Sequence, residues 1–304
     1  MDLKGMRIVV TGGAGFIGSH LVDSLVESNR VIVIDDLRDG EREFVHPDAN
    51  LIEKPIRNCD LCDFIEGSDL VFHLAADPSV RELNPENHIN QNFLTTYQVL
   101  EAMREAGVEK IAFASSSTVY GEAEIPTTVD HPTTPISIYG AMKLSSESLI
   151  SSYCHTFGFD AWIYRFANVI GSRLRHGVIY DFIHKLRNNS EELEILGDGE
   201  QEKSYIYIDD CVAAMGLGLE SGTGFNVMNI GTKDRVRVKE IARIVSDGMD
   251  LDPDFKFTGG DRGWKGDVPE MLLEPEKLTE MGWRPDYCSR EAVEKATEDL
   301  LREI

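Results

Sequence analysis

Short apolar runs alternate with segments of helical spacing along the first half of the chain. The apolar runs cover residues 7–10, 31–34, 70–74 and 110–114. Runs of this length, rich in β-branched residues and followed by turn residues, are typical of buried strands. Helical spacing marks residues 19–27, 92–106 and 138–157, and Gly107 follows the second segment as a cap. Alternating strands and helices predict an α/β fold built on a doubly wound parallel sheet.

The second half of the chain has a looser pattern. After Gly171 the alternation of strands and helices weakens, and residues 172–189 have the apolar spacing of a helix with an early basic cluster. The acidic segment 289–304 predicts a surface helix with a solvated face. We expect a smaller substrate-binding lobe to begin in this half.

Composition limits the possible functions. The chain of 304 residues is 42% hydrophobic and 27% charged, which predicts a soluble globular protein and excludes disorder as its main state. Its 53 acidic residues exceed its 30 lysines and arginines, which gives a net charge of −23. This charge argues against nucleic acid as a partner, because phosphate neutralisation needs a basic surface. It also fits adaptation to high intracellular salt, an interpretation that composition alone leaves open.

The expected location is the cytoplasm. No apolar run approaches the roughly 18 residues of a membrane span, and the N-terminus lacks the features of a signal peptide, so we expect no membrane partner. Five cysteines, an odd number, suit free thiols in a reducing compartment. Cys59 and Cys62 have the spacing of a metal-binding pair, but no second pair or histidine cluster accompanies them. Metal binding is therefore the weaker interpretation, and the role of this pair stays open.

A glycine-rich turn follows the first predicted strand and precedes a helix. Its sequence is Thr11-Gly12-Gly13-Ala14-Gly15-Phe16-Ile17-Gly18. Gly12 allows a tight turn, Gly15 lets the backbone approach a pyrophosphate, and Gly18 lets helix and strand pack closely. An ordinary glycine-rich loop is the alternative, but the next strand ends in Asp35-Asp36, where such folds place a ribose-binding acid. This context predicts dinucleotide binding, and Asp35 favours NAD over NADP because its carboxylate repels a 2′-phosphate.

Candidate catalytic groups follow the later strands. In doubly wound sheets, ligands bind beyond the carboxyl ends of strands, which here carry Ala75-Ala76 and Ser115-Ser116-Ser117. Serines are also common in turns for purely local reasons. Tyr139 and Lys143 lie four residues apart on one face of a predicted helix. A phenol is a poor base near neutral pH, and a neighbouring ammonium stabilises its phenolate, so this pair is a candidate acid-base site.

Together these segments resemble the extended short-chain dehydrogenase/reductase family, specifically its nucleotide-sugar epimerases of the UDP-glucose 4-epimerase type. The resemblance covers essentially the whole chain. Besides the glycine turn and the helix with Tyr139 and Lys143, it is carried by His73-Leu74-Ala75-Ala76, Ser115 to Gly121, Arg165 to Gly171, Gly197-Asp198-Gly199 leading to Asp210, Arg262 to Val268, and Gly282-Trp283-Arg284-Pro285.

The resemblance implies a role for each matching residue. Tyr139 is the implied catalytic base, Lys143 its electrostatic partner and a ligand of the nicotinamide ribose, and Ser116 the hydroxyl that holds the reacting sugar oxygen. The implied NAD-binding residues are Gly12, Gly15, Phe16, Ile17, Gly18, Asp35, Asp36, Ile56, Leu74, Ala75, Ala76, Asn92, Ala114, Ser115, Tyr139, Lys143 and Phe166. The implied substrate-binding residues are Ser116, Ser117, Tyr139, Asn168, Val178, Lys203 and Arg262. No metal is implied.

The implied reaction is the NAD-dependent interconversion of UDP-glucose and UDP-galactose through a transient 4-keto sugar. UDP-N-acetylhexosamines and UDP-uronic acids are alternative substrates, and a dehydratase, a reductase and a non-catalytic NAD-binding scaffold are alternative functions. Related dehydratases place an Asp-Glu pair directly after the hydroxyl residue, whereas Ser117 and Thr118 follow here. Non-catalytic relatives typically lose the tyrosine or the lysine, and this chain retains Tyr139 and Lys143.

The chain departs from the family pattern at two positions. Pro55 stands where many relatives have an acid that binds the adenine amine, which puts that contact in doubt. Lys203-Ser204 stands where Arg-Asp is common, so a point charge replaces a bidentate guanidinium. Diphosphate binding would then depend more on Arg262.

Family topology implies interleaved lobes and a homodimer. The NAD-binding Rossmann domain would comprise residues 1–171, with residues 204–231 returning to it. The smaller α/β lobe that binds the nucleotide sugar would comprise residues 172–203 and 232–304. The implied homodimer would be joined by helices near residues 92–106 and 138–157.

Overall fold

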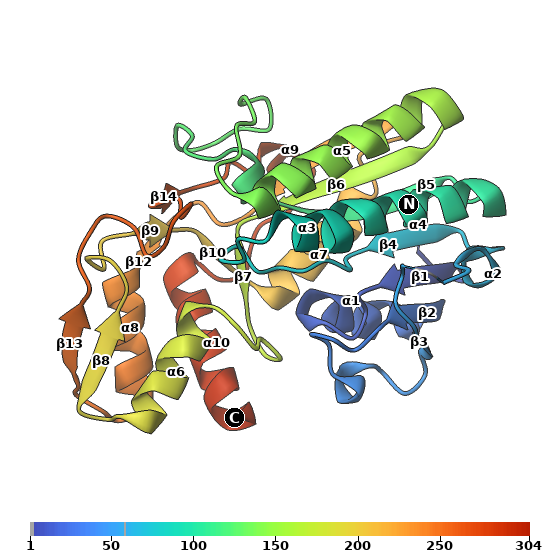
Figure 1. Ribbon diagram of the computed structural model, residues 1–304. Helices are drawn as coiled ribbons and strands as arrows, with labels where there is room; N and C mark the ends of the chain where they lie inside the picture. The colour runs from blue at the N-terminus through green and yellow to red at the C-terminus, as the bar shows by residue number, and fades with distance from the viewer. Residues whose placement is uncertain (1–2, 58) are drawn as a thin grey trace. The chain divides into compact units, whose positions relative to one another are not determined.

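A computed structural model describes residues 3–57 and 59–304 of the chain, which divides into two compact units (Figure 1). Unit 1 comprises residues 1–119, 138–165 and 215–228. Unit 2 comprises residues 120–137, 166–214 and 229–304. Helix α7 (Ile208–Gly218) and strand β11 (Phe225–Ile230) contribute residues to both units. These units are regions of dense internal contact, whereas the predicted lobes are defined by the ligand that each would bind. The assignment of NAD and nucleotide sugar to separate lobes therefore stays a prediction.

A seven-stranded sheet forms the centre of unit 1, in the order β11-β6-β5-β4-β1-β2-β3. Its other strands are β1 (Arg7–Thr11), β2 (Arg30–Asp35), β3 (Asn50–Glu53), β4 (Leu70–His73), β5 (Lys110–Ser116) and β6 (Asp160–Phe166). β1 pairs in parallel with both β2 and β4, and the pairs β2–β3 and β4–β5 are parallel as well. The strand order reverses between β1 and β4, which is where ligands bind in such sheets. The predicted doubly wound α/β fold is confirmed.

Helical segments connect these strands. They are α1 (Phe16–Val26), the 3₁₀ turn η1 (Arg42–Phe44), α2 (Cys62–Ile65), α3 (Pro85–His88), the π-helical turn η2 (Ile89–Phe93), α4 (Leu94–Ala106), the 3₁₀ turn η3 (Ser117–Val119) and α5 (Ile138–Phe157). The bounds of α5 agree with the prediction. Helix α1 begins three residues before the predicted start, because the glycine turn leads directly into its first turn.

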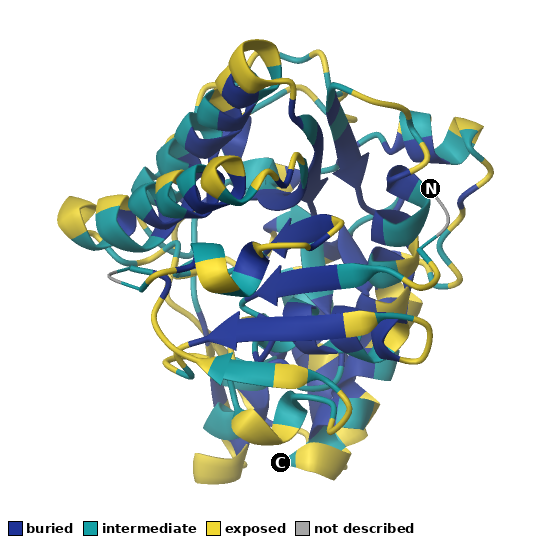
Figure 2. Cartoon of the chain, turned by 90° about the vertical axis from the view of Figure 1, so that its right-hand side faces the viewer, coloured by how far each residue is buried: buried dark blue, intermediate teal, exposed yellow. Residues whose placement is uncertain are grey.

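Alternate side chains of the strands form the core on one face of the sheet. Val9, Ile32 and Ile111 are buried in one cluster together with residues of α4 and α5. Figure 1 shows these two helices side by side. Figure 2 shows the strands at the centre of the sheet as buried, and the edge strand β3 as half-buried or exposed. Burial on both faces explains why these strands read as continuous apolar runs in the sequence.

The predicted helix at residues 92–106 needs a correction. Its α-helical part begins only at Leu94, and Asn92 lies in the π-helical turn before it. The Thr96 hydroxyl donates to the Asn92 carbonyl at 2.8 Å, and the Thr95 hydroxyl lies 2.6 Å from the Gln91 carbonyl and 3.1 Å from that of Asn92, so both side chains bind carbonyls of this wider turn. The cap at Gly107 is confirmed, because its φ of +68° is left-handed.

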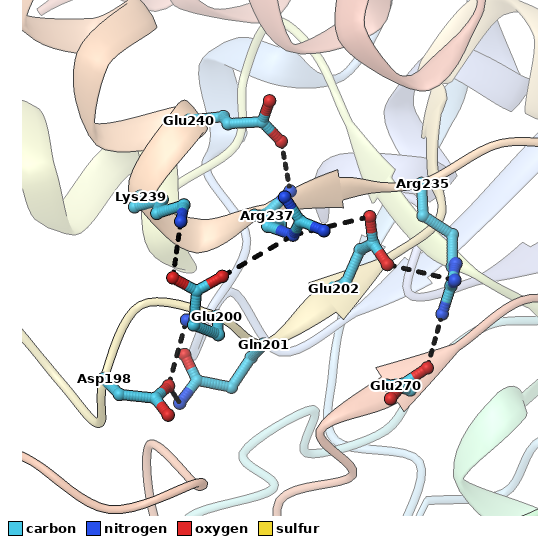
Figure 3. A network of polar contacts seen from close by, with 9 residues as sticks. All are labelled: Asp198, Glu200, Gln201, Glu202, Arg235, Arg237, Lys239, Glu240 and Glu270. Carbon is cyan, nitrogen blue, oxygen red and sulfur yellow. Dashed lines mark hydrogen bonds and ion pairs between the residues drawn. The ribbon is translucent and has the colours of Figure 1, made fainter.

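Unit 2 contains three small sheets. Their strands are β7 (Asn168–Ile170) with β10 (Tyr205–Tyr207), β8 (Glu192–Ile195) with β13 (Asp254–Phe257), and β12 (Val236–Arg237), β9 (Glu202–Lys203) and β14 (Glu270–Met271) in that order. Ion pairs reinforce the three-stranded sheet (Figure 3). The Glu202 carboxylate lies 3.0 Å from Arg235, which also contacts Glu270 at 2.8 Å. Contacts from Glu202 and Glu200 to Arg237 extend this network, so ion pairs join all three strands.

The helices of unit 2 are α6 (Val178–Asn188), α8 (Val238–Gly248), α9 (Glu276–Glu280) and α10 (Ser289–Glu303). The predicted helix at 172–189 begins six residues too early. Arg173 and Gly177 have φ values of +63° and +89°, which an α-helix does not allow. The predicted surface helix at the C-terminus is α10, which also buries Val293 and Leu300. No helix within residues 3–57 and 59–304 is both long enough and apolar enough to cross a bilayer.

Candidate active site

The glycine turn lies against the end of the neighbouring strand. Gly12 has φ +71°, and a Cβ added there would lie 2.6 Å from the Ala75 backbone nitrogen. A Cβ on Gly18 would lie 2.1 Å from the Gly12 carbonyl oxygen. Side chains are therefore excluded at both glycines, and the turn is held against Ala75. Two groups of predicted cofactor residues, from distant parts of the sequence, meet here.

The first turn of α1 suits an anion. Gly15 caps the helix without a side-chain hydrogen bond, and no acidic residue occupies the first turn. Backbone N–H groups at the start of a helix have no partner within the helix and carry the positive end of its dipole. Phe16, Ile17 and Gly18 supply these groups. With no room for side chains at the glycines, the turn fits a pyrophosphate, as the sequence predicts.

Asp35 ends β2 beside the glycine turn. One oxygen of its carboxylate accepts a hydrogen bond from Ala14 N and the other from Leu37 N, each at 2.9 Å. Burial raises the pKa of Asp35, and these two hydrogen bonds oppose that change. The carboxylate is thus held in one orientation at the strand end, as a ribose ligand would need. Asp36 follows as a more exposed residue paired with Arg38 at 3.2 Å.

Asn92 holds the segment that follows β4. Its side-chain oxygen accepts from Asp77 N at 2.7 Å, and its amide nitrogen donates to the Asp77 carbonyl at 3.2 Å. The same nitrogen lies 3.1 Å from His88 Nδ1. The side-chain nitrogen and oxygen of Asn92 therefore both have partners within the protein. Asn92 fixes the backbone beyond Ala75 and Ala76, and its predicted role as a direct cofactor ligand stays a prediction.

Tyr139 and Ser116 form the centre of the candidate catalytic group. Ser116 Oγ accepts hydrogen bonds from Thr118 N at 3.2 Å and from the Thr118 hydroxyl at 3.0 Å. Its own proton therefore remains available to donate. A hydrogen bond with Ser116 lowers the pKa of the half-buried Tyr139, as expected for a donor to the phenol oxygen. The predicted hydroxyl and the predicted base are thus brought together.

Two features of the site oppose ionisation of Tyr139. Burial is the larger one, and the nearby Asp77 carboxylate adds to it, so that the pKa of the phenol is raised overall. The ring also packs against the His88 ring, with centroids 6.2 Å apart. A phenolate here needs further positive charge close by to form near neutral pH.

Lys143 brings such a charge to the same face of α5. Its ammonium donates to the Ala114 carbonyl at 2.7 Å and lies 5.8 Å from the centre of the Tyr139 ring. Burial lowers the pKa of Lys143 to about 7, although Glu147 raises it. The lysine is therefore close to the boundary between its charged and neutral forms at physiological pH. A hydroxyl, a phenol and an amine with such pKa shifts make the carboxyl end of β5 a candidate acid-base site.

The remaining predicted cofactor residues lie at strand ends or in the core. Leu74 and Ala76 follow β4 and are half-buried, and Ser115 is buried at the end of β5. Ile56 belongs to the apolar core beside α4. Phe166 ends β6 and is buried. Strand ends are the expected positions in this fold, whereas the core position of Ile56 gives no sign of a ligand contact.

Three of the predicted substrate residues are connected within unit 2. The Asn168 side chain donates to the Ser204 carbonyl at 3.2 Å, beside Lys203. The Lys203 ammonium donates to the buried Asp267 carboxylate at 2.5 Å, and Arg262 Nη1 donates to the Asp267 carbonyl at 2.9 Å. Val178 is the first residue of α6 and lies at its N-terminus, directly after Gly177.

Both predicted diphosphate ligands already have acidic partners. Arg262 contacts the Glu122 carboxylate at 2.6 Å, and Lys203 also lies 5.0 Å from the centre of the Trp264 ring. A diphosphate at these cations would share them with Asp267 and Glu122.

Sequence reasoning missed three residues of the candidate site. Asp77 affects the pKa of Tyr139, Thr118 orients Ser116, and Glu147 affects the pKa of Lys143. The sequence positions of two of them could have indicated a role. Asp77 is the first charged residue after the β4 strand end, and Glu147 follows Lys143 by one further helical turn.

Comparison with known proteins identifies the family of this chain. The model of the NAD dependent epimerase/dehydratase family matches residues 8–231. A UDP-glucose 4-epimerase of Corynebacterium glutamicum is 32% identical, over 96% of this chain and 94% of the relative. A crystal structure of a UDP-galactose 4-epimerase is 46% identical, with a TM-score of 0.91 over 98% of this chain and 100% of its own. A UDP-N-acetylglucosamine 4-epimerase from Methanobrevibacter ruminantium, in complex with UDP-N-acetylmuramic acid, is 30% identical, with a TM-score of 0.90 over 99% and 100%.

Proposed function

The chain belongs to the NAD-dependent epimerase/dehydratase family, and we propose that it interconverts UDP-glucose and UDP-galactose. The observation that carries this proposal is the contact between Ser116 and Tyr139 beside Lys143, at the carboxyl end of β5. The relatives named as UDP-glucose and UDP-galactose 4-epimerases support the choice of substrate, because they match nearly the whole chain.

The chain's own residues would move one proton and orient the sugar. Tyr139, as the phenolate, takes the proton from the sugar 4-hydroxyl, and the Lys143 ammonium stabilises the phenolate beforehand. Thr118 already donates to Ser116, so the one Ser116 proton is free to turn from the phenol oxygen to the reacting sugar oxygen when substrate binds. When bound, NAD supplies the hydride acceptor for carbon 4 of the sugar and the source of its return. Tyr139 then gives the proton back to the 4-oxygen.

A dehydratase is the alternative that the family name itself includes. Elimination of water needs an acid-base pair beside the hydroxyl residue. Ser117 and Thr118 occupy those positions, and Thr118 is engaged with Ser116. This arrangement favours epimerisation. N-acetylated and uronic sugars remain alternative substrates, and the relative named as a UDP-N-acetylglucosamine 4-epimerase gives the first of them specific support.

We also propose a homodimer in the cytoplasm. Ile89, Tyr97 and Phe157 are large apolar side chains of unit 1 that are 40–45% exposed, and they lie on η2, α4 and α5. Exposed aromatic and aliphatic residues on neighbouring helices favour association with a second copy of the chain. All five cysteines are free, which fits a reducing compartment.

NMR of the purified protein with UDP-galactose and no added cofactor tests the activity. Appearance of the anomeric proton of UDP-glucose would support both epimerisation and retained NAD. Tyr139→Phe should lower turnover by about 10² or more while NAD stays bound. Tyr153→Phe, on the same helix but bonded to Glu101, is the matched control and should leave turnover unchanged.

The same experiment separates the alternative substrates. Parallel incubations with UDP-N-acetylgalactosamine and UDP-galacturonic acid would show which sugar turns over fastest. If folded, NAD-loaded protein converted neither hexose but converted one of these sugars, the hexose assignment would fall and the 4-epimerase assignment would stand.

A further inference from the structure

Three successive residues at the end of β5 each contact one side chain of α5. The contacting pairs are Ser116 with Tyr139, Ala114 with Lys143, and Ser115 with Glu147. The three α5 residues follow one another at intervals of four, so they lie along one face of the helix. The first two belong to the candidate catalytic group. The third, Glu147, has no role in the proposed reaction as described so far.

The Glu147 carboxylate is buried and held from two sides. Arg165 of β6 donates to it through Nη2 at 2.7 Å and through Nε at 3.1 and 3.3 Å. The Ser115 hydroxyl donates to it from β5. The side chains of Glu147 and Arg165 are only 4% and 8% exposed. A carboxylate with this many charge-assisted donors is fixed in place.

The surroundings of Lys143 contain few other charges. On α5 it has Tyr139 and Glu147 as neighbours, and from β5 it meets the Ala114 carbonyl and the Phe113 ring, whose centre lies 4.9 Å away. From β4 it meets His73, which burial keeps neutral by lowering its pKa to about 3. Among these groups only Glu147 brings a negative charge that favours the ammonium.

We propose that Glu147 is a positioning residue for the reaction, because its fixed carboxylate favours the charged form of Lys143 and holds the end of β5 in register with α5. This inference rests on the proposed function. Glu147 acts through Lys143 and does not touch the sugar. Without its charge, the buried lysine would lose its proton at a lower pH, and the Tyr139 phenolate would lose its stabilising partner.

The competing explanation is that Glu147 serves only as the ion-pair partner of Arg165. Two variants distinguish this structural role from an effect on Lys143. Glu147→Gln removes the charge but keeps an oxygen for Ser115. It also leaves Arg165 as an unpaired buried cation, so this variant can fail to fold. Glu147→Gln combined with Arg165→Met removes both charges and keeps side chains of similar length. Neutral replacement of a buried ion pair is often tolerated, so the double variant should fold.

The quantity to measure is the titration midpoint of the Lys143 side chain in the cofactor-loaded protein as purified. NMR of protein with isotopically labelled lysine follows it directly, and loss of the signal in Lys143→Met identifies the residue. In the wild type, the midpoint should lie near the pKa of about 7 that burial produces. We expect the double variant to have a midpoint about one pH unit lower or more, with a thermal unfolding midpoint close to that of the wild type. Turnover at pH 7.5 should fall about tenfold, with KM unchanged.

Glu101→Gln is the matched control. Glu101 also binds a tyrosine hydroxyl and an arginine, Tyr153 and Arg104, at 2.5 and 3.0 Å, but lies on α4. This control should leave the Lys143 titration unchanged. A stable double variant that titrates like the wild type would overturn the inference and leave Glu147 as the partner of Arg165 alone. The titration needs no turnover, so failure of the proposed epimerase activity would be recognised separately.

Discussion

Thr11 Oγ1 and His73 Nδ1 lie 2.7 Å apart and join the ends of the two central strands, β1 and β4. Thr11 leads into the glycine turn, and His73 leads into the segment with Ala75. On its other side, His73 Nε2 lies 3.1 Å from Thr96 Oγ1. One neutral imidazole therefore connects the glycine turn, the β4 strand end and helix α4.

The hydrogen-bond network determines which nitrogen of His73 carries the proton. The Thr96 hydroxyl donates to the Asn92 carbonyl at 2.8 Å, so it can only accept from His73 Nε2–H. Nδ1 is then the acceptor, and the Thr11 hydroxyl donates to it. This tautomer leaves the Thr11 oxygen able to accept from Ala75 N, which lies 3.4 Å away.

His73 should make the stability of the fold depend on pH. Burial, together with the Lys143 charge, lowers its pKa to about 3 in the folded protein, whereas an unfolded histidine has a pKa of about 6.5. As the pH falls below about 6.5, the unfolded chain takes up a proton that the folded chain cannot. Stability should therefore decrease by up to about 1.4 kcal/mol per pH unit from this group.

His73→Asn tests this contribution. Urea unfolding at several pH values between 5 and 8 should show lower stability at pH 8, by about 1–3 kcal/mol, because the Thr11 and Thr96 contacts are weakened. Below pH 6.5, the unfolding free energy of the variant should fall less steeply with decreasing pH than that of the wild type. His155→Asn, on an exposed position of α5, should keep the wild-type slope. Parallel curves for the wild type and His73→Asn would refute the assignment.

Asp35 should control the choice of cofactor. Its two oxygens accept from Ala14 N and Leu37 N, whereas an amide offers only one acceptor. Asp35→Asn should therefore lower stability by about 1–3 kcal/mol and weaken NAD binding about tenfold, with less discrimination against NADP. Calorimetric titration of cofactor-free protein with each cofactor measures this. Asp48→Asn, at an exposed position, is the control, and equal effects in the two variants would exclude Asp35 as the ribose ligand.

Lys203 should contribute to substrate affinity rather than to turnover. It lies between the Asp267 carboxylate and the Trp264 ring, and a charge-assisted contact to a diphosphate is worth about 1.5–3 kcal/mol. Lys203→Gln should raise KM about tenfold or more and leave kcat nearly unchanged. Lys256→Gln removes an exposed lysine that also pairs with an aspartate, Asp254, and should change neither constant. A fall in kcat alone would contradict the predicted role of Lys203.

The proposed homodimer should dissociate when charge is placed on its helices. Tyr97 is 44% exposed on α4, so replacing it by aspartate costs little in the isolated chain. At an interface, the same change would bury an unpaired charge. Light scattering after gel filtration should give twice the chain mass for the wild type and a shift toward the single-chain mass for Tyr97→Asp. A wild type with the mass of one chain would refute the proposal.

The excess of acidic residues should make the fold more stable in salt. With 53 acidic residues against 30 lysines and arginines, repulsion among carboxylates outweighs the surface ion pairs, which individually contribute little. Raising KCl from 0.05 to 1 M shortens the Debye length from more than about 10 Å to about 3 Å. Stability should rise by roughly 1 kcal/mol or more, a shift in Tm of about 2–4 °C. A falling Tm would mean that networks such as that of Glu202 and Arg235 dominate instead.

Residues close in sequence determined the glycine turn with its flanking strand and helix, and the bounds of α5. The strand, the glycine turn and the helix up to Val26 follow from short-range geometry, because the nearby Gly12 carbonyl leaves Gly18 no room for a side chain. The lack of room at Gly12 itself comes from the distant Ala75 backbone. The bounds of α5 also follow from local spacing, since its apolar positions and the pair Tyr139 and Lys143 repeat at helical intervals. These features could be predicted from the sequence because each depends on residues within a few turns of one another.

Only the tertiary structure decided which side chains complete these local elements. The start of α6 was mispredicted because the left-handed backbone at Arg173 is invisible in apolar spacing. The two-residue strands of unit 2 form only because distant segments pair, as Lys203 does with Val236. Glu147 looks like an ordinary surface acid in the sequence. Its contacts with Ser115 and Arg165, 32 and 18 residues away, exist only where two strands and a helix meet, and they bury its charge beside Lys143.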